Sequence, residues 1–154
     1  MRVEAIAPQV LAGLRRSDDA GRETEAYVDK KGGLLLRCCL TRSVAGDRIA
    51  LVSYAPLRRW AEDAGVDPGA YVELGPIFIH AGECPGPADA YPDALHGGDR
   101  VLRAYDPSGR ILGGKVVPPG EGPRAAAEWF ADPGVALVHV RAVEFGCFMF
   151  ELRR

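Results

Sequence analysis

The chain has 154 residues, 47% of them hydrophobic, so it can bury roughly two thirds of its unfolded surface and is expected to form a single domain over residues 1–154 with one core. Its formal net charge of −2, without any run of Lys and Arg, argues against nucleic-acid binding. No stretch approaches the ~18 apolar residues of a membrane span and none has the pattern of a signal peptide, so we expect a cytoplasmic protein without a membrane partner.

The first forty residues are expected to form one helix and two strands. Apolar residues recur at helical spacing between residues 5 and 16, which predicts a short amphipathic helix with Pro8 in its first turn. Residues 23–28 are expected to form an edge strand. The run LLLRCCL at residues 34–40 follows a glycine turn and predicts another strand. Because side chains alternate between the faces of a strand, Cys38 and Cys39 are expected to point apart.

The middle of the chain is expected to contain a central strand with a histidine at its exit. Residues 48–54 predict a strand, and residues 57–64 predict one or two helical turns that end at Gly65. Residues 75–80 (GPIFIH) form a short apolar run with glycine and proline on both sides, which is typical of a strand with defined ends. Residues 83–98 are rich in Pro, Gly and Asp and predict a long surface loop.

The C-terminal third is expected to contain a hairpin, a helix and two further strands. Strands at residues 101–105 and 111–117 flank the sequence Asp-Pro-Ser-Gly at residues 106–109, which has the residue types of a type I turn. Residues 124–131 predict a helix that ends at an Asp-Pro-Gly sequence. Together these elements predict an α+β fold in which two or three short helices pack on a mostly antiparallel sheet.

The last two strands are expected to pair in a register that separates apolar from polar side chains. Pairing Val140 with Phe148 and Val138 with Phe150 gives one wholly apolar face. The same register places His139 opposite Met149. It also places Arg141 opposite Cys147, on the polar face.

Five short motifs in the same order resemble a known family. They are LRCCL at residues 36–40, RIALVSY at 48–54, GPIFIH at 75–80, RAYD at 103–106, and FADP at 130–133 followed by His139 and GCF at 146–148. Over about residues 34–152 the chain is similar to the bacterial domain of unknown function 1203 family. The resemblance implies no chemistry, so no catalytic residue is assigned from it.

Strand alternation could gather positive and polar side chains on one face of the sheet. Such a cleft would suit an anionic or carboxylate-bearing small molecule, because guanidinium groups pair bidentately with carboxylates. His80 and His139 could act there as acid or base, with Cys147 as a third catalytic candidate. The alternative is that the arginines reach solvent and that each histidine makes one structural hydrogen bond. The expected ligand-binding residues are Arg37, Cys39, Phe78, Arg103, Tyr105 and Arg141.

The four cysteines leave metal and thiol chemistry open. No two of them form a Cys-x-x-Cys motif. In a cytoplasmic protein they are expected to be reduced. Metal-ligand residue types occur at Cys39, His80, Cys84, His139 and Cys147, but they are scattered, so we predict no metal and no cofactor. For thiol chemistry, Cys147 or Cys39 is the expected nucleophile and Cys38 the expected core residue.

Three classes of function therefore follow from the sequence. The first is a protein or enzyme that binds an anionic metabolite at an Arg- and His-lined cleft of the sheet. The second is a non-catalytic module that forms a homodimer or binds a protein through an open sheet edge. The third is a metal- or thiol-dependent enzyme of hydrolase type.

Overall fold

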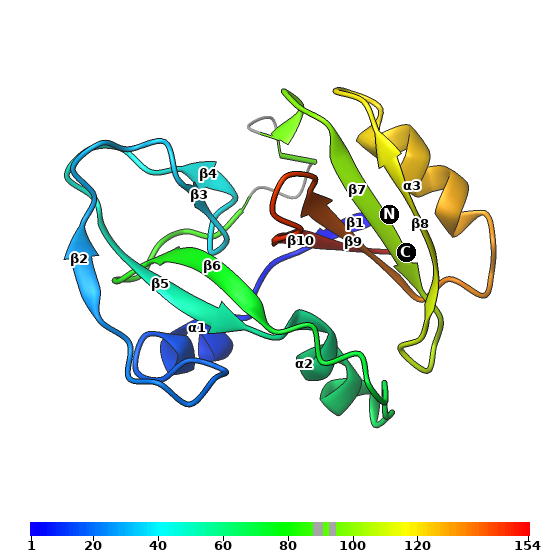
Figure 1. Cartoon of the computed structure of the whole chain (residues 1–154), viewed down its shortest axis with the longest axis horizontal. Coiled ribbons are helices and arrows are strands. Elements are labelled where there is room, and N and C mark those ends of the chain that lie inside the picture. The colour runs from blue at the N-terminus through cyan, green and yellow to red at the C-terminus, as the bar shows by residue number, and fades with distance from the viewer. Residues whose placement is uncertain (88–90, 93–94) are drawn as a thin grey trace.

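The computed structural model describes residues 1–87, 91–92 and 95–154. Within these residues it contains ten strands and three helices, and the strands form two five-stranded sheets that lie side by side (Figure 1). The predicted α+β class with mostly antiparallel pairing is confirmed. None of the helices in the described part of the chain is long and apolar enough to cross a membrane.

The first sheet is antiparallel throughout and is made mainly of the C-terminal half of the chain. Helix α3 (Gly122–Phe130) covers one face of this sheet, as Figure 1 shows. The predicted hairpin is present as β7 (Arg100–Tyr105) and β8 (Ile111–Val117), joined by the Asp-Pro-Ser-Gly turn. The strand order is β1 (Arg2–Glu4), β10 (Phe148–Arg153), β9 (Leu137–Ala142), β7 (Arg100–Tyr105) and β8 (Ile111–Val117).

The second sheet has the predicted central strand β6 (Gly75–His80) in its middle. Helix α1 (Pro8–Leu14) packs against this sheet through Leu11 and Leu14. The pairing of β3 with β6 is parallel, so the chain segments that follow these two strands leave the sheet at the same end. The strand order is β2 (Ala26–Val28), β5 (Arg48–Tyr54), β6, β3 (Leu35–Leu36) and β4 (Thr41–Arg42).

Helix α2 (Pro56–Ala64) lies between β5 and β6 of the second sheet in the chain and packs against the first sheet. It begins with a proline in its first turn, where the missing N–H is not needed, and ends at Gly65 with a left-handed φ of 66°, as the sequence predicts. Its buried Leu57 packs with Tyr105 and Leu137 of the first sheet.

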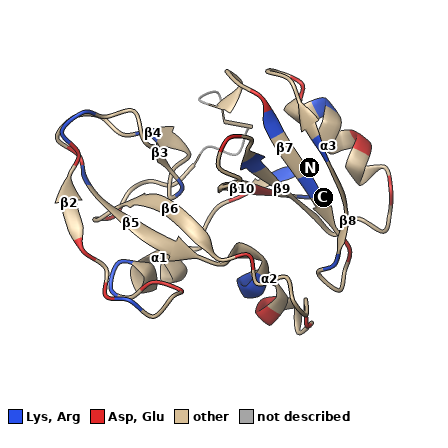
Figure 2. Ribbon diagram, viewed as in Figure 1, with Lys and Arg blue, Asp and Glu red and all other residues tan. Residues whose placement is uncertain are grey.

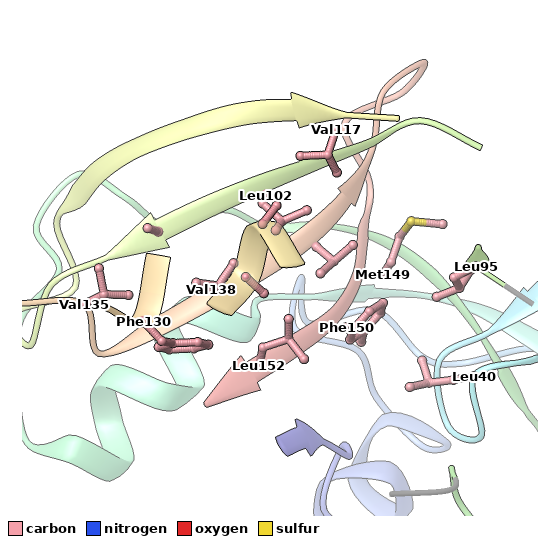
Figure 3. Close-up of a cluster of buried hydrophobic side chains, with 14 of the residues drawn as sticks. Leu40, Leu95, Leu102, Val117, Phe130, Val135, Val138, Met149, Phe150 and Leu152 are labelled. Carbon is pink, nitrogen blue, oxygen red and sulfur yellow. The ribbon is translucent and has the colours of Figure 1, made fainter. Parts of the chain in front are cut away.

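Among the described residues, the buried apolar side chains form two large clusters and a smaller one, where chain length led us to expect one core. The largest lies between the first sheet and α3, yet it includes Leu35 and Leu40 from the second sheet. Figure 3 shows Leu40 beside Phe150 at one end of this cluster. Conversely, Phe148 of β10 belongs to the core of the second sheet. Each sheet therefore completes the core of the other.

The strand predicted at residues 34–40 is wrong beyond Leu36. Only Leu35 and Leu36 pair as β3, and the chain then turns so that the N–H of Leu40 donates to the carbonyl of Leu36 over 2.7 Å. As a result Cys38 and Cys39 do not point apart, and their Sγ atoms lie 4.0 Å from each other. A short apolar run has no periodicity that separates a buried turn from a buried strand, which explains the error.

The register predicted for the last two strands is also wrong, although the apolar face is largely as expected. A bulge between Phe148 and Phe150 adds one residue to β10, so Phe150 pairs with Val140 rather than with Val138. His139 consequently lies opposite Glu151 and not opposite Met149. The bulge lets Met149 enter the core beneath α3 while Phe148 turns to the other face.

Candidate functional site

The residues nominated from the sequence fall into two groups on different sheets, not into one cleft. The first group lies on β7 and β9 of the first sheet, where Figure 2 shows arginines in blue. It contains Arg103, Tyr105, His139 and Arg141. The second group lies at the exit of β6 and contains Cys39 and His80.

The first group converges on the carboxylate of Glu73, a residue just before β6. Tyr105 Oη donates to Glu73 Oε2 over 2.5 Å, and Arg141 donates to the same oxygen over 2.6 Å. Arg103 donates to Glu73 Oε1 over 2.9 Å. We call these four residues together with His139 the Glu73 cluster. The Glu73 cluster connects the loop before β6, a strand of the second sheet, with β7 and β9 of the first sheet.

The electrostatics of the Glu73 cluster keep the glutamate ionised. Burial alone would raise the pKa of Glu73, but the hydrogen bond from Tyr105 and the charges of Arg141 and Arg103 outweigh it and lower the pKa. Burial and the neighbouring carboxylate both raise the pKa of Tyr105, so the phenol stays protonated as a donor. Glu73 adopts a left-handed φ of 51°, a conformation that is uncommon for a residue with a side chain. Three donors hold it there.

His139 lies behind Glu73 and is fully buried between aromatic rings. Its ring is 4.8 Å from that of Tyr105 and 5.0 Å from that of Phe148. Nε2 lies 3.1 Å from Oε2 of Glu151, which as a carboxylate can only accept, so Nε2 carries the proton. Nδ1 has no hydrogen-bond partner within the described residues and lies 4.0 Å from Glu73 Oε2. Burial lowers the pKa of His139, although Glu151 opposes this effect.

A cleft of about 270 Å³ opens on the solvent side of the Glu73 cluster. Glu73, Arg103 and Arg141 line it, but His139 does not. Cys147 lies in the wall of this cleft. The other lining residues are Leu74, Gly75, Pro76, Phe145, Gly146 and Phe148.

Arg37 and Phe78, the remaining nominated residues, lie outside the two groups. Arg37 is buried and spans the sheets, donating from Nε to the carbonyl of Phe148 over 3.0 Å and from a terminal nitrogen to that of Leu35 over 2.5 Å. Burial lowers its pKa to about 10, although Cys147 opposes this shift. Because Phe148 lines the cleft and Arg37 does not, the bond to the Phe148 carbonyl places the guanidinium behind the cleft wall. Phe78 pairs with Leu51 and packs against the core of the second sheet.

The second group gathers three thiols around one imidazole. His80 Nδ1 lies 3.4 Å from the Sγ of Cys38 and 3.8 Å from that of Cys39, and Cys84 completes the set with ligand atoms all within 4.8 Å of one another. We call Cys38, Cys39, His80 and Cys84 the thiol cluster. The hydrogen bond between the two adjacent thiols raises the pKa of Cys38 and lowers that of Cys39. Such a donor set, of soft sulfur and imidazole, can hold a transition metal.

Sequence reasoning missed Glu73, Glu151 and the role of Cys38. Glu73 stands alone in a loop, and no spacing links it to β7 or β9. The predicted register gave His139 the partner Met149, and only the bulge brings Glu151 opposite His139. Cys38 was assigned to the core, which is correct for its burial but not for its contacts. Its adjacency to Cys39 was the available signal.

Comparison with known proteins identifies a family and nothing more specific. A family model described as "Protein of unknown function (DUF1203)" matches residues 33–154. No curated protein and no solved structure matches the chain significantly.

Proposed function

Since the chain belongs to DUF1203, a family of unknown function, we propose from the geometry that it binds a small anionic, carboxylate-bearing metabolite in the cleft above Glu73. The observation that carries this proposal is the imbalance of charge around the cleft. Arg103 and Arg141 line it and Arg37 lies behind it, whereas Glu73 is the single acidic residue among the lining residues.

Unused donor capacity supports the same conclusion. Nε of Arg141 is buried and has no hydrogen-bond partner within the described residues. Arg103 uses one terminal nitrogen on Glu73, and about a third of its side chain remains exposed to the cleft side of the sheet. A guanidinium with free N–H groups in a partly dehydrated cleft favours a carboxylate, which accepts two parallel hydrogen bonds.

The size of the cleft limits the ligand to a small molecule. At about 270 Å³ it lies just below the usual range for ligand pockets, about 300–1,000 Å³. The exposed ring of Phe145 and the apolar Leu74 at the rim provide surface for a short hydrocarbon part. Because the Nδ1 atom of His139 lies behind Glu73 and not in the wall, the geometry supports binding better than acid–base catalysis.

Titration with small carboxylates tests the proposal. We would follow the amide NMR spectrum while adding mono- and dicarboxylates of two to six carbon atoms, each paired with its neutral amide. Saturable shifts confined to residues 73–76 and 145–148 with carboxylates, and none with amides, are expected. The Arg103→Gln variant should weaken binding about tenfold, the effect of one lost charge-assisted hydrogen bond.

Arg48→Gln is the matched control, because Arg48 is an exposed arginine on the second sheet. It should bind the carboxylate with unchanged affinity. Equal weakening in both variants would show nonspecific charge attraction. Absence of saturable shifts with every carboxylate and also with inorganic phosphate would refute the proposal.

We further propose that the protein works in a bacterial cytoplasm, because all four cysteines are unpaired in the structure and the cytoplasm keeps thiols reduced. A fusion to a reporter that is active only in the cytoplasm would test the location.

A second candidate function is self-association through the edge of the first sheet. Strand β8 is seven residues long and leaves one edge of the sheet open, and its Leu112 and Val116 are exposed apolar residues on the same face. A homodimer would pair this edge with its copy. Light scattering should then show a dimer that Val116→Lys converts to a monomer. A monomer at all accessible concentrations would exclude this candidate.

A further inference from the structure

The thiol cluster is assembled by three separate chain segments. The parallel pairing of Leu36 with Phe78 sets the end of β3 beside the exit of β6, and the N–H of Arg37 donates to the carbonyl of Phe78 over 2.8 Å. The turn after β3 thus delivers Cys38 and Cys39 to the ring of His80. The loop that follows β6 then returns Cys84 to the same point.

The turn itself is built so that two adjacent cysteines face one way. Leu40 has a left-handed φ of 58°, and its N–H closes the turn on the carbonyl of Leu36. Leu40 is anchored in the core beneath α3, which fixes the end of the turn. The conformation costs on the order of 1 kcal/mol for a residue with a side chain, so the structure maintains it against an intrinsic preference.

The three distances among Cys38, Cys39 and His80 are close to those of a tetrahedron around a metal ion, and Cys84 lies within 4.8 Å of all three ligand atoms. With zinc bonds of about 2.3 Å to sulfur and about 2.05 Å to nitrogen, tetrahedral ligands lie about 3.8 Å apart for two sulfurs and about 3.6 Å apart for sulfur and nitrogen. The two adjacent Sγ atoms are 4.0 Å apart. The Nδ1 of His80 lies 3.4 Å and 3.8 Å from them. We propose that the four side chains of the thiol cluster bind one zinc ion, each through one atom, in a closed tetrahedral site.

The surroundings of the cluster provide the second shell that such a site needs. The backbone N–H of His80 donates to the Sγ of Cys38 over 3.2 Å, and Thr41 Oγ1 lies 3.1 Å from the Sγ of Cys39. On the far side of the imidazole, Asp47 Oδ2 lies 3.7 Å from Nε2. This separation is longer than a hydrogen bond, but the negative charge of Asp47 favours a proton on Nε2, which leaves Nδ1 free to ligate.

Charge and access are also consistent with a zinc ion. Three thiolates and a neutral imidazole leave the site with a net charge of −1 once zinc is bound. Arg15, which donates to the carbonyl of His80 over 3.1 Å, supplies the nearby compensating charge. A surface cleft of about 450 Å³ is lined by Arg15, Cys38 and Cys84 and gives the ion a route to the ligands.

Four protein ligands leave no open coordination position, so the ion acts structurally and not as a catalyst. Its role is to fasten the turn after β3 and the loop after β6 to the end of the central strand. The site shares no residue with the cleft above Glu73, so the inference is independent of the carboxylate proposal.

Zinc content and cobalt substitution of the full chain test the inference. Protein purified under reducing conditions without a metal-binding tag should contain about one zinc per chain by elemental analysis. Replacement by Co²⁺ should produce thiolate-to-cobalt charge-transfer absorption and the intense visible bands of tetrahedral cobalt. Zinc below about a tenth of an equivalent, with no charge-transfer band on adding Co²⁺, would overturn the proposal.

The closed four-ligand geometry has its own controls. Cys84→Ser should lower zinc affinity by more than about tenfold, because even second-shell changes cost that much, whereas Cys147→Ser should leave it unchanged. In the wild type, zinc should protect Cys84 from alkylation but not Cys147, a readout that does not depend on the folding of a variant. Equal zinc affinity of the two variants, or Cys84 alkylation that zinc does not slow, would contradict ligation by Cys84.

Discussion

The two polar clusters of the molecule satisfy their charges in opposite ways. In the Glu73 cluster the carboxylate receives three donors from β7 and β9, so anion and cations are both part of the chain. In the thiol cluster every member offers a lone pair, and the attraction among them depends on a proton or a cation. The first cluster is an ion network whose two arginines outnumber its one ionised glutamate. The second is a set of side chains that can act as metal ligands.

Because of this difference, the two clusters contribute to the free energy of unfolding under different conditions. Removing Glu73 or Arg141 leaves a buried charge without its partner, so the cost falls on folding whether or not metal is present. Removing a member of the thiol cluster costs only what the bound ion contributes, and that contribution depends on the concentration of free metal. Stability measured with and without metal therefore separates the two.

The largest effect is expected from Glu73→Gln. The substitution removes the one negative charge that faces the buried Arg141 and the partly exposed Arg103, and it places an amide where three donors converge. We expect the free energy of unfolding to fall by about 3–5 kcal/mol, as for other broken buried ion pairs. Urea denaturation measures it.

Glu144→Gln is the control for this prediction, because Glu144 is exposed in the loop after β9. Its effect should stay within about 0.5 kcal/mol. If both variants lose the same small amount, the Glu73 cluster is not the internal ion network that its geometry describes.

Chelation should give the second largest effect and act on the other cluster. With free zinc at ~1,000 times its dissociation constant, a bound ion stabilises the fold by about 4 kcal/mol. For a chain of this length that corresponds to a fall in Tm of roughly 10 °C when a chelator is added. Calorimetry of the wild type and of Cys84→Ser measures it, and the variant should show little response. A chelator-induced fall of equal size in both proteins would mean that the ion is held elsewhere.

The same contrast explains how much the sequence could reveal. The strands around the two clusters were predictable, because β5, β6, β7 and β8 carry clear apolar runs and turn residues at their ends. Four members of the Glu73 cluster were also nominated, since alternation along β7 and β9 places Arg103 and Arg141 on the face that carries Tyr105 and His139. Local periodicity was sufficient for these features.

Features that depend on contacts between distant segments were not predictable. The carboxylate at the centre of the first cluster comes from a loop 30 residues or more away from its partners, and nothing local marks it. The thiol cluster needs the parallel pairing of β3 with β6 and a tight turn in place of a strand, both of which reverse the sequence-based reading of residues 34–40. Scattered cysteines become ligands only through tertiary structure.

An acid-dependent loss of stability is the third expected effect, and it arises from His139. Glu73, Glu151 and Arg141 are the charged groups around this ring, and burial lowers its pKa below the ordinary value of 6.5. The folded state therefore keeps His139 neutral where the unfolded chain binds a proton. Stability from this residue is fully present above pH ~6.5 and falls below it, by up to about 1.4 kcal/mol per pH unit.

The variant His139→Gln isolates this effect, because its amide can still donate to Glu151 while it cannot titrate. Both proteins keep His80 and His96, so the difference between their unfolding free energies reports His139 alone. That difference should shrink as the pH falls from 7.5 to about 5.5. Glu73 and Glu151, whose pKa values are lowered, lose their contribution only below their ordinary value of 4.5, outside this window. A difference that stays constant with pH would show that burial does not shift the pKa of His139, and one that grows as the pH falls would show that the buried ring is protonated in the folded state.

The smallest effect on stability is expected from Arg103→Gln. This variant tests whether Arg103 mainly stabilises the fold or mainly binds the ligand. Arg103 and Arg141 donate to the same carboxylate, but 32% of the Arg103 side chain is exposed against 10% for Arg141. Water can replace the exposed guanidinium, so Arg103→Gln should cost less than about 1 kcal/mol of stability, whereas Arg141→Gln should cost about 3 kcal/mol. Urea denaturation of the two variants measures both. A small stability cost at Arg103 combined with weakened carboxylate binding would assign this arginine to the ligand. Equal costs at the two positions would instead make both of them structural partners of Glu73.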